Sequence, residues 1–160
     1  MTDPTFKTCL WFDADGLEAA EMYCSLFEDA EITNISYHTD ANTYGETGRP
    51  LEVDFRLGSQ LFVALNGGPQ FPHTEAVSIQ VYVEDQAELD RLWEGLLAGG
   101  GEPTMCGWLR DRFGLSWQVI PTRLAELMNN TDAAASERVV ARMLTMQKLD
   151  IAELEAAAEA

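Results

Sequence analysis

The chain has 160 residues, with 27 acidic and 10 basic side chains and a formal net charge of −17 at pH 7. This length corresponds to one compact domain or two half-domains sharing a core, and 46% hydrophobic residues suffice to build that core. The negative charge excludes nucleic acids and anionic membrane surfaces as partners, because both are bound through clustered Lys and Arg.

The first part of the chain predicts one helix and four strands. A bulky apolar run at residues 7–12 indicates a strand. Asp15 with Glu18 three residues later is a capping-box pattern, which predicts that a helix begins there. Three more strands are expected at residues 32–38, 51–57 and 61–66, separated by glycine and proline turns. The predicted order is therefore β-α-β-β-β.

The same order begins again near residue 76. A strand at residues 76–83 is followed by Asp85 and Glu88, a second capping-box pattern, and by a helix that ends at the glycines 99–101. Shorter strands are expected at residues 103–108 and 115–120.

The two halves match when they are shifted by 70 positions, which indicates an internal repeat of one supersecondary unit. In this alignment the strand and the helix cap coincide, with Thr8 on Ser78, Phe12 on Tyr82, and Asp15 on Asp85.

The residues after Pro121 predict helices. A short helix is expected at residues 124–128, and a longer one from about 133 to 157, without Gly, Pro or aromatic residues. The longer helix has an apolar stripe that must cover either the domain itself or a second copy. We favour a homodimer in which this helix takes part.

Three stretches resemble the vicinal oxygen chelate (VOC) superfamily, which includes glyoxalase I and the bleomycin- and fosfomycin-resistance proteins. They are TCLWFDADGLEAAEMYCSLF, LFVALNGGPQF and CGWLRDRFGLSWQVIPT. Together they look like the PhnB-like subgroup, whose domain is often labelled 3-demethylubiquinone-9 3-methyltransferase. The resemblance covers almost the whole chain, including the helical tail.

This resemblance implies an α+β fold in which two tandem βαβββ modules form a curled mixed sheet around a central cavity. The expected domain spans residues 1–122, with modules at 6–68 and 75–121, and a helical extension follows at 123–160.

The resemblance also implies where a metal would bind in the metal-dependent relatives, at a His or Gln on each first strand and a Glu on each last strand. In this chain those positions are Thr8, Ser78, Asn66 and Gln118. Hydroxyls and neutral amides are poor ligands beside imidazole and carboxylate, so we expect no catalytic metal and no cofactor. His38 and His73 have no partner at ligand spacing, and we interpret both as surface residues.

Strand alternation predicts which side chains line the cavity. We expect Thr8 and its alternate neighbours to point inward, and Cys9 and Trp11 to pack outward against the helices. The predicted ligand-binding residues are Thr8, Leu10, Phe12, Phe62, Asn66, Ser78, Gln80, Tyr82, Cys106, Trp108, Ser116 and Gln118. This lining suits a small hydrophobic or aromatic ligand held by a few hydrogen bonds. Alternatively, the polar side chains bond one another inside a filled cup.

Binding of such a molecule without a metal is the function we expect. The alternative is a VOC-type enzyme, such as a lyase, isomerase or dioxygenase, with an atypical site, for which Asp111, Asp54 and Glu52 are the acid–base candidates. Cys106 is the candidate nucleophile, although no histidine lies near it in the sequence. The methyltransferase label is not supported, because the turn after the first strand reads DADG and not the glycine-rich turn of a doubly wound fold.

Three features of the sequence indicate the cellular compartment. No stretch is long and apolar enough to span a membrane, and no secretion signal begins the sequence. Three cysteines without CxxC spacing fit a reducing environment. We therefore expect a cytoplasmic protein with a small-molecule ligand and no membrane or nucleic-acid partner.

Overall fold

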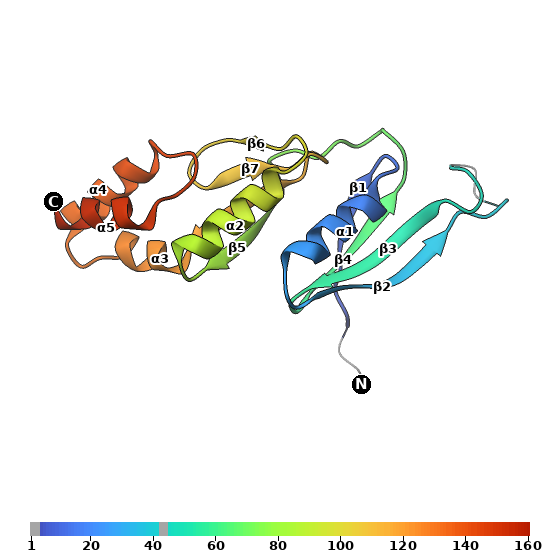
Figure 1. The fold of residues 1–160 in the computed structure, drawn as a ribbon, viewed down its shortest axis with the longest axis horizontal. Coiled ribbons are helices and arrows are strands. Elements are labelled where there is room, and N and C mark those ends of the chain that lie inside the picture. The colour runs from blue at the N-terminus through green and yellow to red at the C-terminus, as the bar shows by residue number, and fades with distance from the viewer. Residues whose placement is uncertain (1–3, 42–44) are drawn as a thin grey trace. The chain divides into compact units, whose positions relative to one another are not determined.

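The computed structural model describes residues 4–41 and 45–160 (Figure 1). The chain divides into two compact units, the first ending at His73 and the second running from Thr74 to Ala160. Each unit contains one four-stranded mixed sheet and follows the order βαβββ, and three further helices complete the second unit. The predicted α+β class with two βαβββ modules and C-terminal helices is confirmed. Within the described ranges, no helix has the length and apolarity needed to cross a membrane.

The first unit forms its sheet in the order β1-β4-β3-β2. β1 and β4 run parallel, and the other neighbours are antiparallel. Its elements are β1 (Thr8–Phe12), α1 (Gly16–Leu26), β2 (Ala30–Tyr37), β3 (Pro50–Leu57) and β4 (Gln60–Asn66).

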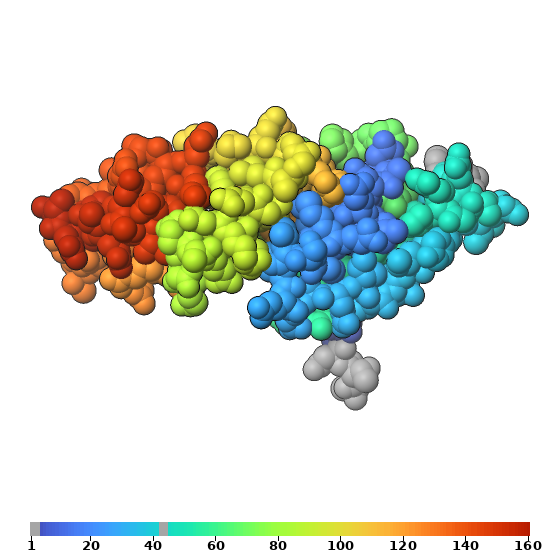
Figure 2. Space-filling view, viewed as in Figure 1, coloured from blue at the N-terminus to red at the C-terminus, as the bar shows by residue number. Residues whose placement is uncertain are grey.

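Helix α1 covers one face of this sheet, and its atoms fill much of the near side of the first unit (Figure 2). Tyr23 on α1 is fully buried, and its ring lies 6.1 Å from that of Phe55 on β3. Phe55 in turn stacks on Phe62 of β4 at 5.1 Å. The sheet side chains beneath α1 are almost entirely apolar, so this contact is the hydrophobic core of the unit.

The second unit forms its sheet in the order β5-β8-β7-β6, again with one parallel pair, β5 and β8. Helix α2 packs on the face that carries Leu109, Trp117 and Val119, each at most 1% exposed. Asp85 caps α2 as predicted, because its side chain accepts from the Glu88 backbone N–H at 2.9 Å. The elements are β5 (Ser78–Val83), α2 (Gln86–Leu97), β6 (Glu102–Pro103), β7 (Trp108–Arg110) and β8 (Ser116–Pro121).

The strand predicted at residues 103–108 is wrong. A tight turn interrupts it, closed by the Trp108 N–H donating to the Met105 carbonyl at 2.9 Å. Both central residues have positive φ, 56° at Cys106 and 82° at Gly107, which is the conformation of a type I′ turn. Two short strands, β6 and β7, therefore flank a hairpin turn where one strand was expected.

The long helix predicted at 133–157 is also wrong, because two helices occupy that range. The tail comprises α3 (Thr122–Met128), α4 (Ala133–Met143) and α5 (Ile151–Glu159). The interruption at residues 144–150, which we call the strap, packs on the β6–β7 turn. Backbone N–H groups of Cys106 and Gly107 donate to the carbonyls of Met146 and Gln147 at 2.8 and 2.7 Å.

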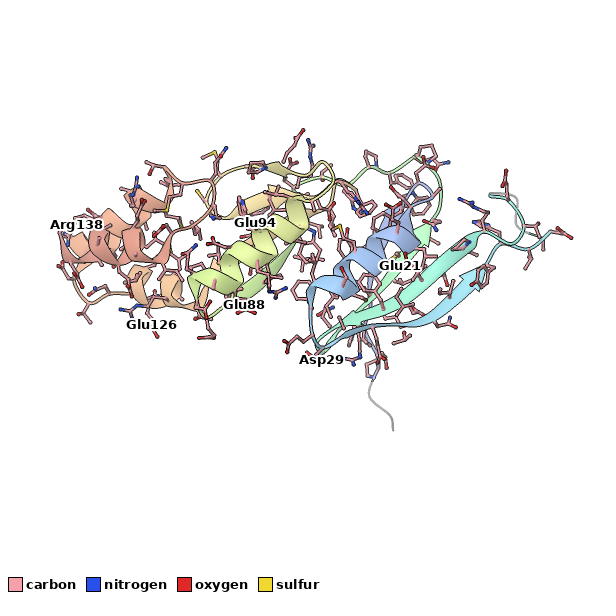
Figure 3. All side chains as sticks on the ribbon, in the orientation of Figure 1. Glu21, Asp29, Glu88, Glu94, Glu126 and Arg138 are labelled. Atoms are coloured by element: carbon pink, nitrogen blue, oxygen red, sulfur yellow. The ribbon has the colours of Figure 1, made fainter. Side chains whose placement is uncertain are left out.

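Two features hold the tail helices beside this strap. Asp150 caps the N-terminus of α5, because its side chain accepts a hydrogen bond from the Glu153 backbone N–H at 3.0 Å. Arg138 of α4, labelled in Figure 3, donates to the carbonyls of Ala157 and Ala158 at the end of α5. Carbonyls at a helix end lack partners within the helix, so the guanidinium stabilises this terminus.

Candidate functional site

A line of hydrogen-bonded polar side chains crosses the face of the second sheet opposite α2. The Tyr82 hydroxyl donates to Gln80 Oε1 at 3.0 Å, and Gln80 Nε2 donates to Gln118 Oε1 at 3.2 Å. Gln118 Nε2 then donates to the Ser78 hydroxyl oxygen at 2.8 Å. Each of these bonds fixes the orientation of the next group, so the four side chains form one ordered array.

The strand register explains why these side chains meet. Gln80 on β5 pairs directly with Gln118 on β8, and Ser78 pairs with Ser116. Trp108 on β7, the other neighbour of β8, also pairs with Gln118. These residues therefore share one face, as strand alternation predicts.

Exposure varies along this face. Tyr82 is 58% exposed, Gln80 is also exposed, and Trp108 is half-buried. Ser116 is 2% exposed. The face thus combines exposed aromatic surface with donors and acceptors whose directions are fixed. A bound molecule with an apolar body and one polar group could use both features.

The predicted direction of the first-module side chains is wrong. Thr8, Leu10, Phe12, Phe62 and Asn66 share a face by register, and that face is the one α1 covers. A Cβ added to Gly16 of α1 would lie 3.3 Å from the Phe12 ring and 3.1 Å from the Ala64 Cβ. Leu10, Phe12 and Phe62 are each 3% exposed and belong to the core.

Cys9 and Trp11 consequently lie on the face opposite α1 and not against the helix as expected. The Trp11 indole N–H donates to the Gly68 carbonyl at 2.7 Å, and its ring meets Phe71 edge-on at 5.0 Å. Gly67 approaches the Trp11 ring so closely that a Cβ there would collide with it. The loop at residues 67–69 therefore packs against an indole, which gives its glycines a structural role.

The side-chain directions predicted for the first unit are wrong because the two units differ by one residue in the loop between the first strand and the helix. The helix caps Asp15 and Asp85 are 70 positions apart, but the last buried strand residues, Phe12 and Val83, are 71 apart. Three residues separate β1 from α1, whereas two separate β5 from α2. Side chains alternate with period two, so aligning the strands by their caps exchanges the two faces.

Asn66 has a structural role in the first unit. It is 5% exposed, and its side-chain oxygen accepts from the Gly16 backbone N–H at 2.9 Å. Its amide nitrogen donates to the Pro50 carbonyl at 3.0 Å. Asp15, the expected cap of α1, makes no side-chain capping bond, so Asn66 supplies an acceptor at this helix end.

The donors at the four family positions do not fit a metal ion. Thr8 and Asn66 lie under α1, and Gln118 and Ser78 bond each other. Within residues 4–41 and 45–160, no three His, Cys, Asp or Glu side chains gather where they could hold a metal ion. Neutral hydroxyls and amides that already bond within the protein are weak ligands for a transition metal.

The acid–base candidates lie in three different settings. Asp111 is 3% exposed, and its carboxylate accepts from the N–H groups of Phe113 and Leu115 and from the Trp117 indole, all within 3.1 Å. Asp54 pairs with Lys7 at 2.7 Å, and Glu52 is exposed. Asp111 therefore shapes the β7–β8 turn, and Asp54 is engaged in an ion pair.

The cysteine candidate Cys106 lies in the β6–β7 turn, where its backbone anchors the strap. Cys9, on the first sheet, has a thiol whose pKa is raised by partial burial and by the carboxylate of Glu52. A raised pKa leaves less thiolate at neutral pH, which disfavours a nucleophilic role for Cys9.

One of the two histidines differs from its predicted surface position. His38 is buried, with 5% of its surface exposed, and lies at the end of β2. The β2–β3 pairing shifts register twice before His38 is reached, with the extra residue in β2 between Ile32 and Asn34 and in β3 opposite the step from Ser36 to Tyr37. The sequence pattern contained no signal for these bulges.

Two mixed four-stranded sheets, each with one helix in βαβββ order, are the fold expected from the resemblance to the VOC superfamily. A family model described as 3-demethylubiquinone-9 3-methyltransferase matches residues 4–120, and the chain belongs to this PhnB-like family. In a search of curated proteins, none matches this chain.

Solved structures agree with this assignment. The PhnB protein from Bacillus cereus is 30% identical, with a TM-score of 0.67, over 74% of this chain and 100% of that one. PA1353 from Pseudomonas aeruginosa, 22% identical, has a TM-score of 0.62 over 74% of this chain and 98% of its own. The fosfomycin resistance protein FosX from Mesorhizobium loti, 15% identical, has a TM-score of 0.51 over 75% and 92%. The last two are similar in fold.

Proposed function

We propose that this protein binds a small organic molecule with an aromatic or largely apolar body on the face of the second sheet opposite α2. The observation that supports this proposal is the ordered line Tyr82–Gln80–Gln118–Ser78. Exposed polar side chains normally bond to water and sample many rotamers, so fixing them in one array lowers the entropy cost of binding a ligand.

The chemistry of the array favours a ligand with both a ring and a hydrogen-bonding group. Each glutamine amide keeps a second N–H beyond the one used in the line, and the Ser78 hydroxyl keeps its own hydrogen. Tyr82 and Trp108 supply aromatic surface on the same face, on which a flat apolar body can pack.

The methyltransferase activity in the family description has no support in this fold. A doubly wound S-adenosylmethionine enzyme needs a mainly parallel sheet with helices on both faces. Each sheet here has one parallel strand pair, and one helix follows its first strand.

A fragment screen by protein-observed NMR tests the proposal, with aromatic amides and phenols as probes. We expect saturable shifts at the backbone amides of β5 and β8. Gln118→Leu keeps the side-chain size but removes the amide, so it should weaken the best probe about tenfold. The matched control is Gln60→Leu, which removes an exposed amide from the first sheet.

Either of two results would overturn the proposal. One is that none of the probes gives saturable shifts at β5 and β8. The other is a best probe whose affinity is the same for Gln118→Leu as for the control.

We also propose that the protein acts as a cytoplasmic homodimer. The tail offers apolar surface for this contact, because Leu144 is 54% exposed and Met128 is 37% exposed. Three free cysteines suit a reducing compartment. Sedimentation equilibrium should give twice the chain mass, and Leu144→Asp should shift the equilibrium towards monomer. A monomeric wild-type protein, or a dimer unaffected by Leu144→Asp, would contradict the role of the tail.

A further inference from the structure

The dipeptide Asn66–Gly67 at the end of β4 is chemically labile. It is the one Asn-Gly pair in the sequence. In such a pair the backbone nitrogen of the glycine attacks the side-chain carbonyl carbon of the asparagine, and glycine has no Cβ to obstruct ring closure. An Asn-Gly pair in an unfolded chain is therefore favourable for spontaneous deamidation.

The folded structure engages each group that this reaction uses. The Asn66 side-chain oxygen accepts from the Gly16 N–H at 2.9 Å, and the side-chain nitrogen donates to the Pro50 carbonyl at 3.0 Å. The attacking nitrogen, that of Gly67, donates its own hydrogen to the Phe12 carbonyl at 3.0 Å. Asn66 is also a strand residue, and ring closure requires its extended backbone to rotate. The pair therefore cannot react until these hydrogen bonds break.

Both residues of the pair have structural roles that explain why they occur together. Asn66 is 5% exposed, and its amide satisfies one backbone donor and one backbone acceptor. Gly67 lies against the Trp11 indole, where an added Cβ would collide with the ring. Hydrogen bonding thus requires an amide at one position, and close packing requires glycine at the next.

Water, the second reactant, has a route to the pair. Asn66 and Gly67 both line a cavity of about 630 Å³ in the first unit. One water molecule occupies about 30 Å³ in the liquid, so the cavity has room for water beside the reacting groups. Access of water therefore does not limit the reaction, and the hydrogen bonds around Asn66 do.

We infer that Asn66–Gly67 is a latent deamidation site, closed in the folded protein and activated when the start of α1 separates from β4. On opening, the Gly67 nitrogen bonds to Asn66 Cγ, the Cγ–Nδ2 bond breaks, and ammonia leaves with the Gly67 hydrogen. Water then hydrolyses the succinimide to aspartate or isoaspartate. Neither product has the amide donor for the Pro50 carbonyl, and isoaspartate adds a methylene group to the backbone. The original hydrogen bonds therefore cannot re-form.

Incubation of the full chain in mildly alkaline buffer, with and without denaturing urea, tests this inference. Peptide mapping by mass spectrometry measures conversion at each asparagine, and an ammonia assay measures the total. In urea, Asn66 should convert faster than the other asparagines, which are Asn34, Asn42, Asn129 and Asn130. In the native protein its conversion should be about a hundredfold slower than in urea, because it requires a rare local opening.

Gly16→Ala should open the site without removing it. An added Cβ would lie 2.7 Å from Asn66 Oδ1, so the alanine displaces the amide from the start of α1. We expect Asn66 to convert about tenfold faster in this native variant. The matched control is Gly58→Ala in the turn between β3 and β4, where φ is 56° and no atom obstructs the new Cβ. It lowers global stability through backbone strain and should change the Asn66 rate less than about twofold.

Three results would overturn the inference. The first is that Asn66 converts as fast in the native protein as in urea. The second is that, in urea, Asn66 converts no faster than the other asparagines. The third is that Gly16→Ala accelerates conversion no more than Gly58→Ala once both rates are compared at equal global stability, measured by urea unfolding. The reaction would then follow global unfolding and not the release of α1 from β4.

Discussion

The side-chain oxygen of Asn66 lies 2.9 Å from the backbone nitrogen of Gly16, so the last residue of β4 supplies a hydrogen bond to the first residue of α1. The amide nitrogen of Asn66 reaches the first residue of β3, Pro50, at 3.0 Å. One buried side chain therefore joins three elements of the first unit. Its amide can satisfy both backbone partners at once, since it carries a donor and an acceptor.

Asn66→Ala should destabilise the protein by about 2 kcal/mol, because it leaves a buried N–H and a partly buried carbonyl without partners. Asn66→Asp keeps the acceptor for Gly16 but loses the donor for Pro50 and buries a charge, so we expect it to destabilise the protein as well. Urea unfolding measures both, with Gln60→Ala as an exposed control. An Asn66→Ala variant as stable as the control would contradict the structural role.

Cys106→Gly should be neutral or slightly stabilising. A φ of 56° costs a non-glycine residue about 1 kcal/mol, and glycine avoids this cost. Glycine also has more conformational entropy in the unfolded chain, which lowers stability by a similar amount and offsets the gain. The same substitution at Cys24, in the interior of α1, should destabilise by about 1 kcal/mol. Thermal unfolding compares the two variants. Equal losses at both positions would show that the turn does not require positive φ.

Asp90 should make the stability of the tail contact depend on pH. Hydrogen bonds from Lys148 at 2.6 Å and from Gln86 at 3.0 Å lower the pKa of its carboxyl in the folded protein. A lowered pKa stabilises the fold above the ordinary aspartate range, and this contribution is lost as pH falls through the folded-state pKa.

Asp90→Asn should therefore be less stable than wild type at neutral pH, by less than about 1 kcal/mol because the pair is partly exposed. The difference should vanish on acidification. Unfolding curves collected from neutral pH to below the aspartate range measure it. A difference that stays constant with pH would rule out the ion pair as its cause.

Cys9 should react slowly with iodoacetamide at neutral pH despite its exposed position. Partial burial and the Glu52 carboxylate both raise the pKa of its thiol, which keeps it protonated. Glu52→Gln removes one cause and should increase the rate severalfold. Site-resolved mass spectrometry follows each cysteine. Cys24 is an internal control, since burial and Glu31 raise its pKa, and its rate should not respond to Glu52→Gln.

Most of the fold could be predicted from the sequence, because hydrophobic periodicity and cap residues act locally. The order of helices and strands through both units follows from such signals, as does the Asp85 cap. The interruption of the tail helix could not be predicted from periodicity. The strap is not helical, and its carbonyls accept hydrogen bonds from Cys106 and Gly107 in a turn that is distant in the sequence. Such a tertiary contact has no signature in the local hydrophobic pattern. A local signal did exist, since Asp150 and Glu153 form a capping-box pair.

The site was predictable in the second unit and not in the first. Ser78, Gln80, Tyr82 and Gln118 share a face because β5 and β8 are regular over their whole pairing. In the first unit the face depends on the length of the loop after β1, and the position of His38 follows two register shifts in the β2–β3 pairing. Period-two reasoning fails after a single inserted residue.

The extra residue between β1 and α1 also affects how residue roles can be transferred between the two halves of the chain. An ungapped alignment of the two halves places Phe12, a core residue, against Tyr82, an exposed one. A gap placed within residues 13–15 instead matches Phe12 with Val83 and Trp11 with Tyr82. Any comparison of the two halves that counts matched positions should fix this gap first. Otherwise, substitution patterns at core and surface positions are averaged together, and a ligand-contacting column cannot be distinguished from a packing one.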